Sequence, residues 1–152
     1  MNAIIVDQKI KSVTSLLRLT YGIVPIVAGI DKFTNLLTDW THYLNPAIAE
    51  MLPVSPYVFM MIVGGIEIVA GIIVLFRPAI GGIIVAGWLT LIALSLIING
   101  SFLDVAVRDL SMAIGAFSLS RLVRAHSVAT EETSRTTYLF NTSNQTRKQS
   151  VR

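Results

Sequence analysis

The sequence predicts an all-α, polytopic membrane protein, a bundle of four transmembrane helices with a short interfacial helix in its first extracytoplasmic loop. Hydrophobic residues make up 53% of the 152 residues and charged residues only 14%, whereas a soluble domain carries about 25% charged residues. The chain also contains apolar runs close to the roughly 20 helical residues that cross a bilayer. The absence of cysteine excludes disulfides and thiol redox chemistry.

The first predicted helix covers residues 13–33 and follows a short segment with a basic character. One of its faces repeats at steps of 4, 3, 4 and 3 residues, through Arg18, Gly22, Pro25, Gly29 and Lys32. Small residues on such a face let a neighbouring backbone approach closely. We therefore expect Gly22 and Gly29 to pack against another helix.

Residues 34–53 are too polar to span a bilayer, yet they contain apolar residues at helical spacing. Trp40 and Tyr43 are typical of the headgroup level of a membrane. The segment therefore predicts a short interfacial helix outside the bilayer core. A docking surface for a partner protein is the alternative interpretation.

The second and third helices are predicted at residues 54–76 and 79–98. The very short connection at Arg77 and Pro78 predicts an antiparallel hairpin. Asn99 and Gly100 suit the left-handed cap that ends the third helix. Small residues again form stripes on both helices, and these stripes include Gly64, Gly71 and Gly82.

The fourth helix is predicted at residues 102–123, with a stripe formed by Asp104, Arg108, Ser111, Gly115 and Ser118. Because all four helices offer small or polar stripes to a common centre, residues 1–123 predict one closed bundle. Residues 124–152 form a polar tail that is expected to be disordered on its own.

The distribution of charge predicts the orientation of the chain. Lysine and arginine are in excess at the N-terminus, at Arg77 and in the tail, whereas the segment 34–53 and the turn near Asp104 carry mainly acids. By the positive-inside rule, both termini are cytoplasmic and the long first loop is outside.

Glu67 lies near the middle of the second helix, where a carboxylate costs roughly 2.5–3.5 kcal/mol. Such a residue needs a partner. Arg18 enters from the same side, roughly 7 Å deep against roughly 13 Å for Glu67, and its long side chain can close that gap. We therefore predict an intramembrane pair between Arg18 and Glu67. A second cluster is predicted near the outer surface, formed by Asp31, Lys32, Asp104, Arg108 and Asp109. The pair has either a structural role or a functional one in which Glu67 titrates or meets a ligand.

The spacing of Arg18, Gly22, Gly29 and Lys32–Phe33 resembles the first-helix signature of the DoxX family (R-x3-G … G-x2-K-F/L), and Glu67–Gly71 and Asp104 with Arg108–Asp109 look similar to it as well. The resemblance covers about residues 16–123. It implies a small four-helix protein of the bacterial cytoplasmic membrane, in a family associated with quinone-linked thiosulfate oxidation and membrane redox assemblies. The chain differs from redox-active members of such assemblies because it has no cysteine, which excludes a thiol-relay or disulfide-exchange role.

The leading functional hypothesis is a non-catalytic accessory or scaffold subunit of a larger respiratory or photosynthetic redox complex in the membrane. No catalytic residue, metal site, haem ligand pair or flavin motif is recognisable, and no cluster of base-reading residues indicates nucleic-acid binding. Expected partners are membrane lipids and other membrane subunits that contact the first loop and the tail. The alternatives are a small carrier that uses Glu67 and Arg18, and a protein that holds a quinone or lipid between its helices.

Overall fold

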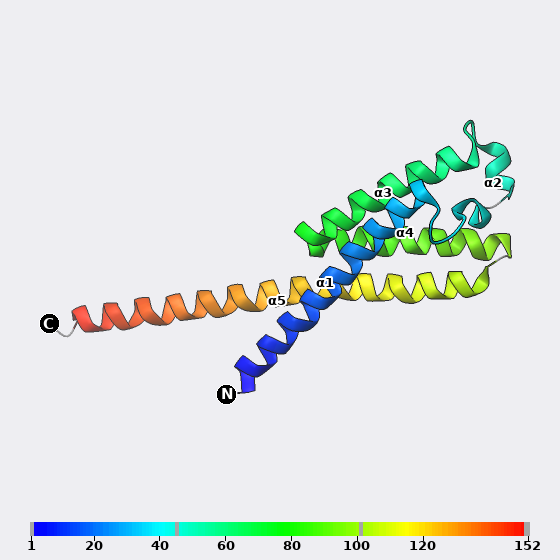
Figure 1. Ribbon diagram of the computed structural model, residues 1–152. Helices are drawn as coiled ribbons and strands as arrows, with labels where there is room; N and C mark the ends of the chain where they lie inside the picture. The colour runs from blue at the N-terminus through cyan, green and yellow to red at the C-terminus, as the bar shows by residue number, and fades with distance from the viewer. Residues whose placement is uncertain (1, 45, 101, 151–152) are drawn as a thin grey trace.

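The computed structural model describes residues 2–44, 46–100 and 102–150, and helices are the only regular secondary structure among these residues. The elements are α1 (Asn2–Thr34), the 3₁₀ helix η1 (Trp40–Tyr43), α2 (Pro46–Met51), α3 (Pro56–Phe76), α4 (Pro78–Asn99) and α5 (Leu103–Ser150) (Figure 1). Within the described residues, three segments are long and apolar enough to cross a membrane: Val6–Thr34 of α1, α3 and α4. The all-helical prediction and the membrane-like character of the chain are thereby confirmed.

Local sequence explains where the central helices begin and end. The Ser55 hydroxyl accepts a hydrogen bond from the amide of Val58, and Pro56 occupies the first turn of α3, a position that proline tolerates. At the end of α4, Gly100 adopts φ 67° and its amide donates to the carbonyl of Ile97. Glycine reaches this left-handed conformation without steric cost, so α4 ends there.

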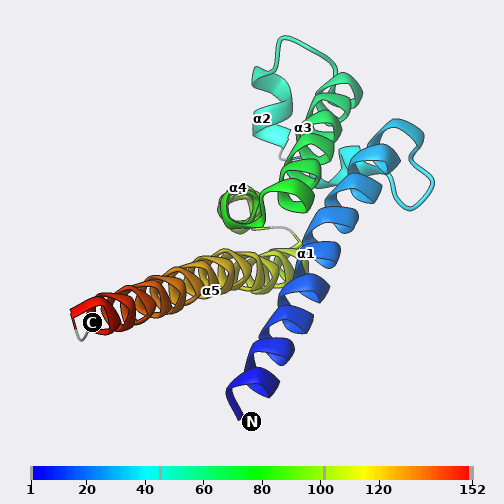
Figure 2. The ribbon, with the colours of Figure 1, turned by 90° about the vertical axis from the view of Figure 1, so that its left-hand side faces the viewer.

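The long helices associate as two pairs. α1 packs on α3 and α4 packs on α5, and the contacts between the two pairs are sparser. Figure 2 shows α4 nearly end-on and α5 running obliquely below it, with α3 and α1 beside them. The first turns of α1 and the last turns of α5 extend from the end of the molecule opposite to α2 (Figure 1).

Glycines set the distance between α1 and α3. A Cβ atom added to Gly64 would lie 2.6 Å from the carbonyl oxygen of Gly29, and one added to Gly71 would lie 2.5 Å from that of Gly22. The backbones therefore touch at two levels along the antiparallel pair. These four glycines are the ones that the sequence assigns to helix packing, and the contact has the geometry expected of small residues in membrane helices.

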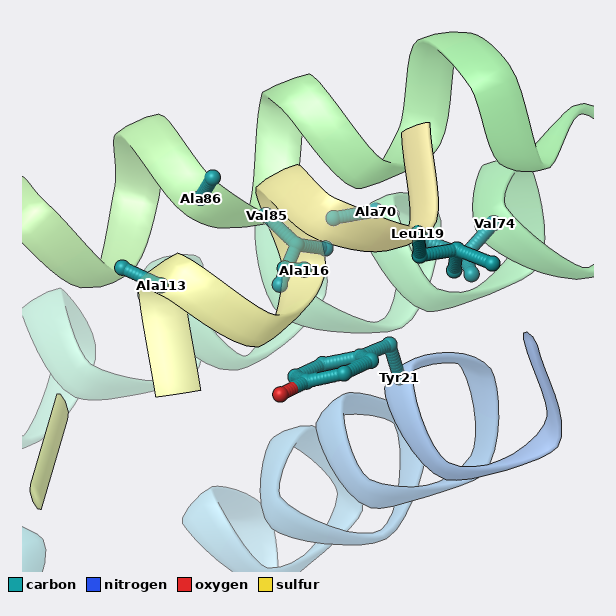
Figure 3. Packing of buried hydrophobic residues seen from close by; sticks show 8 residues of the cluster. All are labelled: Tyr21, Ala70, Val74, Val85, Ala86, Ala113, Ala116 and Leu119. Carbon is teal, nitrogen blue, oxygen red and sulfur yellow. The ribbon is translucent and has the colours of Figure 1, made fainter. Parts of the chain in front are cut away.

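The second pair, α4 and α5, is joined in the same way. A Cβ atom on Gly82 would lie 2.6 Å from the carbonyl oxygen of Ala116, and the Ser120 hydroxyl donates to the carbonyl of Ala79 at 2.5 Å. Tyr21 links the two pairs, because its ring extends from α1 toward buried residues of α3, α4 and α5 (Figure 3). A Cβ atom on Gly115 would meet the hydroxyl of this tyrosine.

The buried face of α5 differs from the predicted one. Its buried residues are Ala106, Asp109, Ala113, Ala116, Leu119 and Ser120, whereas Asp104, Arg108, Ser111 and Ser118 of the predicted stripe are exposed. Residues two positions apart are rotated by about 200° around a helix, so the predicted stripe lies on nearly the opposite side. The prediction followed polar residues, but α4 packs on alanines.

Two helices are longer than the sequence predicted. α1 begins at Asn2 instead of residue 13, and α5 continues to Ser150 instead of ending at residue 123. The expectation of a disordered tail is therefore wrong for the residues that the structure describes. No glycine or proline follows Gly115 in the sequence, and threonine hydroxyls such as that of Thr133 bond back to carbonyls one turn earlier.

The first loop does not form the one interfacial helix that its apolar spacing predicted. It forms η1 and the short α2 instead, and Leu36 and Leu37 remain exposed. Asp39 caps η1 by accepting hydrogen bonds from the hydroxyl and the amide of Thr41. The loop folds back over the end of the bundle, where it contributes to the site described next.

Candidate functional site

A cavity of about 1060 Å³ lies between the two helix pairs and is lined by residues of α1, η1, α3, α4 and α5. Most of the lining residues are aliphatic or aromatic, as in ligand sites generally. The aromatic residues of the wall are Tyr21, Trp40, Tyr43, Phe59 and Trp88. The charged residues of the wall are Lys32, Glu67, Arg108 and Asp109.

Glu67 forms an ion pair with Lys32 on this wall. The Lys32 Nζ lies 2.7 Å from the Glu67 Oε2, and the two side chains are 5% and 11% exposed. Side chains on a helix lean toward its N-terminus. Since α1 and α3 are antiparallel, Lys32 leans down from the last turn of α1 and Glu67 leans up to meet it.

The predicted pair between Arg18 and Glu67 does not form. Arg18 Nη2 donates to the backbone carbonyl of Leu75, in the last turn of α3. The same lean explains the difference, because Arg18 points toward the N-terminal end of α1 and thus away from Glu67. The Leu75 carbonyl is among the last four of its helix, which lack intrahelical donors, so the guanidinium caps α3 instead.

Asp31 fastens the first loop above the cavity. Its Oδ1 accepts hydrogen bonds from the amides of Leu36 and Leu37, each at 3.0 Å, and its Oδ2 accepts one from Trp40 Nε1 at 2.7 Å. The ring of Trp40 in turn covers the Lys32 Nζ, which lies 3.6 Å from the ring centroid. A cation over an aromatic face is attracted to it, so the loop encloses the ion pair from outside.

Arg108 and Asp109 place a second ion pair on the wall, from α5. The Arg108 Nη2 lies 3.3 Å from the Asp109 Oδ1. The Asp109 side chain is 8% exposed, whereas that of Arg108 is 62% exposed. Both ion pairs lie on the wall of the same cavity, which is otherwise largely apolar.

The predicted outer cluster is thus divided. Lys32, Arg108 and Asp109 line the cavity, Asp31 holds the loop, and Asp104 is exposed on the first turn of α5 and does not line the cavity. Lys32 was predicted in the outer cluster and not as the partner of Glu67, although the lean of side chains on antiparallel helices indicates this pairing. Trp88 lines the cavity, and its buried Nε1 has no hydrogen-bond partner among the described residues.

These features define the class of the protein as helical and membrane-like, with a half-open cavity between its helix pairs that carries ion pairs on its wall. Comparison with protein families, with characterised proteins and with solved structures finds no match. Among the residues that the structure describes, no group of three or more histidine, aspartate or glutamate side chains is arranged to hold a metal ion.

Proposed function

We propose that this chain is a polytopic membrane protein that binds a membrane-soluble molecule with an apolar body and a polar head, such as a lipid or a quinone, between its helix pairs. The observation that carries the proposal is the Lys32–Glu67 ion pair on the wall of the cavity of about 1060 Å³. Ligand pockets are mostly apolar with a few polar groups that orient the ligand. Two side chains of opposite charge that face the cavity can orient the polar head of such a molecule.

The membrane arrangement that we propose has four spans. α5 packs along α4 and contributes Asp109 to the cavity, which supports its first half as the fourth span. An even number of spans places both ends of the chain on one side, and the positive-inside rule makes that side cytoplasmic. The resemblance to the DoxX family supports the same arrangement in a bacterial cytoplasmic membrane.

The experiment uses two neighbouring residues of α1. Ala28 lines the cavity, whereas Val27 is 49% exposed on the outer face. The protein is purified in detergent, extracted with organic solvent, and the co-purifying lipophilic compounds are measured by mass spectrometry. We expect Ala28→Phe to lose a compound that both the wild-type protein and Val27→Phe retain. No compound above the detergent control, or equal retention by Ala28→Phe, would overturn the proposal.

A second candidate function, an accessory subunit of a membrane redox complex, is favoured by the long extension of α5. Residues 124–140 are exposed with the exception of His126, and the helix projects away from the bundle (Figure 1). A lone helix of this kind gains little from packing within its own chain. Deletion of residues 124–152 should leave the bundle folded but abolish co-purification with other subunits from native membranes. Purification of the full chain as a stable monomer would contradict the accessory role.

A further inference from the structure

The charged groups on the cavity wall balance one another. Of the described lining residues, Lys32 and Arg108 are cations and Glu67 and Asp109 are carboxylates, so their formal charges sum to zero. Each cation lies beside one carboxylate, at 2.7 Å on the α1–α3 side and at 3.3 Å on α5. A ligand head therefore meets no uncompensated charge of either sign.

Both ion pairs nevertheless leave hydrogen-bonding capacity. Only Oε2 of Glu67 and Oδ1 of Asp109 are engaged, so no described residue donates a hydrogen bond to the second oxygen of either carboxylate. Arg108 directs Nε and Nη2 toward Asp109, and a guanidinium has five N–H donors in all. The polar region thus offers acceptors and donors at once.

Building on the proposed function, we infer that the molecule bound in this cavity has a head group that carries no net charge and that both donates and accepts hydrogen bonds. An anionic head would face the carboxylates of Glu67 and Asp109, and a cationic head would face Lys32 and Arg108. On a largely apolar wall such like-charge contacts are unfavourable. A hydroxyl-type head can donate to a free carboxylate oxygen and accept from the guanidinium.

The aromatic residues do not favour a cationic ligand, although aromatic walls often bind ammonium groups. The ring of Trp40 is already covered by Lys32, with the Nζ 3.6 Å from its centroid. A ligand cation would have to displace this lysine from both Trp40 and Glu67. The remaining aromatic rings of the wall suit the apolar body of the ligand.

The test compares four probes with the same twelve-carbon chain: dodecane, 1-dodecanol, dodecanoate and dodecyltrimethylammonium. The protein has two tryptophans, Trp40 and Trp88, and both line the cavity, so intrinsic fluorescence in nanodiscs reports binding there. The Ala28→Phe variant corrects for partitioning into the bilayer. We expect 1-dodecanol to bind at least about tenfold more tightly than the other three probes, the factor that one net hydrogen bond to a charged group provides.

Two charge variants sharpen the test. Glu67→Gln leaves Lys32 unpaired, so the preference should shift toward dodecanoate by about tenfold. Arg108→Gln, at a side chain that is 62% exposed, leaves Asp109 unpaired and should shift the preference toward dodecyltrimethylammonium. Equal affinities, or a charged probe that binds best to the wild-type protein, would overturn this inference while leaving the cavity as a binding site. Failure of all four probes to bind would overturn the proposed function itself.

Discussion

The Nζ of Lys32 lies 2.7 Å from the Oε2 of Glu67 and joins the last turn of α1 to the middle of α3. This ion pair does two things in the structure. It neutralises a carboxylate that would be costly in a membrane, and it places a donor and an acceptor on the wall of the cavity. The direction in which side chains lean on the antiparallel helices α1 and α3 determines that Lys32, and not another cation, pairs with Glu67.

Removal of the lysine tests which residue neutralises Glu67. Lys32→Met leaves a buried carboxylate without a partner, so we expect the folded state to lose about 3–5 kcal/mol. Arg18→Met removes a cap on an exposed carbonyl and should cost much less. Both changes in stability are measured by unfolding the protein in detergent with dodecyl sulfate and monitoring the loss of helix by circular dichroism. The double variant Lys32→Met with Glu67→Met should recover most of the stability, and a larger loss for Arg18→Met would contradict the pairing.

Two neighbouring glycines of α3 test the helix contact. A Cβ atom on Gly64 would lie 2.6 Å from a backbone oxygen of α1, whereas one on Gly65 would meet nothing within 4 Å. Gly64→Ala should therefore destabilise the protein by about 1–3 kcal/mol through overpacking. Gly65→Ala should be neutral or stabilising by up to about 1 kcal/mol, because alanine favours helices. Equal effects of the two substitutions in the same unfolding assay would argue against close contact between α1 and α3.

The cap of η1 predicts a small pH dependence in the first loop. Hydrogen bonds from the Thr41 hydroxyl and amide hold the pKa of Asp39 below its ordinary value. Because the pKa is lower in the folded state, the stabilisation is present above the unfolded-state pKa and is lost as the pH falls through the folded-state pKa. In Thr41→Val the pKa should rise toward its ordinary value, measured by NMR titration of the carboxyl carbon. An unchanged pKa would mean that the hydroxyl does not stabilise the carboxylate.

The proposed membrane arrangement can be tested by single-cysteine labelling, since the chain has no native cysteine. We expect Leu36→Cys to react with an impermeant maleimide in intact cells. Arg77→Cys and Ser127→Cys should react only after the membrane is permeabilised. Reaction of Ser127→Cys in intact cells would place α5 outside the membrane core and leave three spans.

Much of the architecture follows from the sequence, because the responsible interactions are local. Apolar runs of sufficient length, the Gly100 cap and the short connection at Arg77 define α3 and α4 close to where they are observed. The glycines of α1 and α3 also lie at the helix contact, since small residues permit it wherever two helices meet. The number of spans, their orientation and the family resemblance remain predictions.

Only the tertiary structure decided which polar groups meet. By depth alone Arg18 was a reasonable partner for Glu67, but the lean of the side chains brings Lys32 to it instead. In the same way, the polar residues of α5 predicted the wrong buried face for this helix. The face that is buried packs against small residues of α4. Spacing along one helix determines which residues share a face, whereas the face that becomes buried depends on where the other helices lie. The cavity and its two ion pairs arise from that second, non-local relationship.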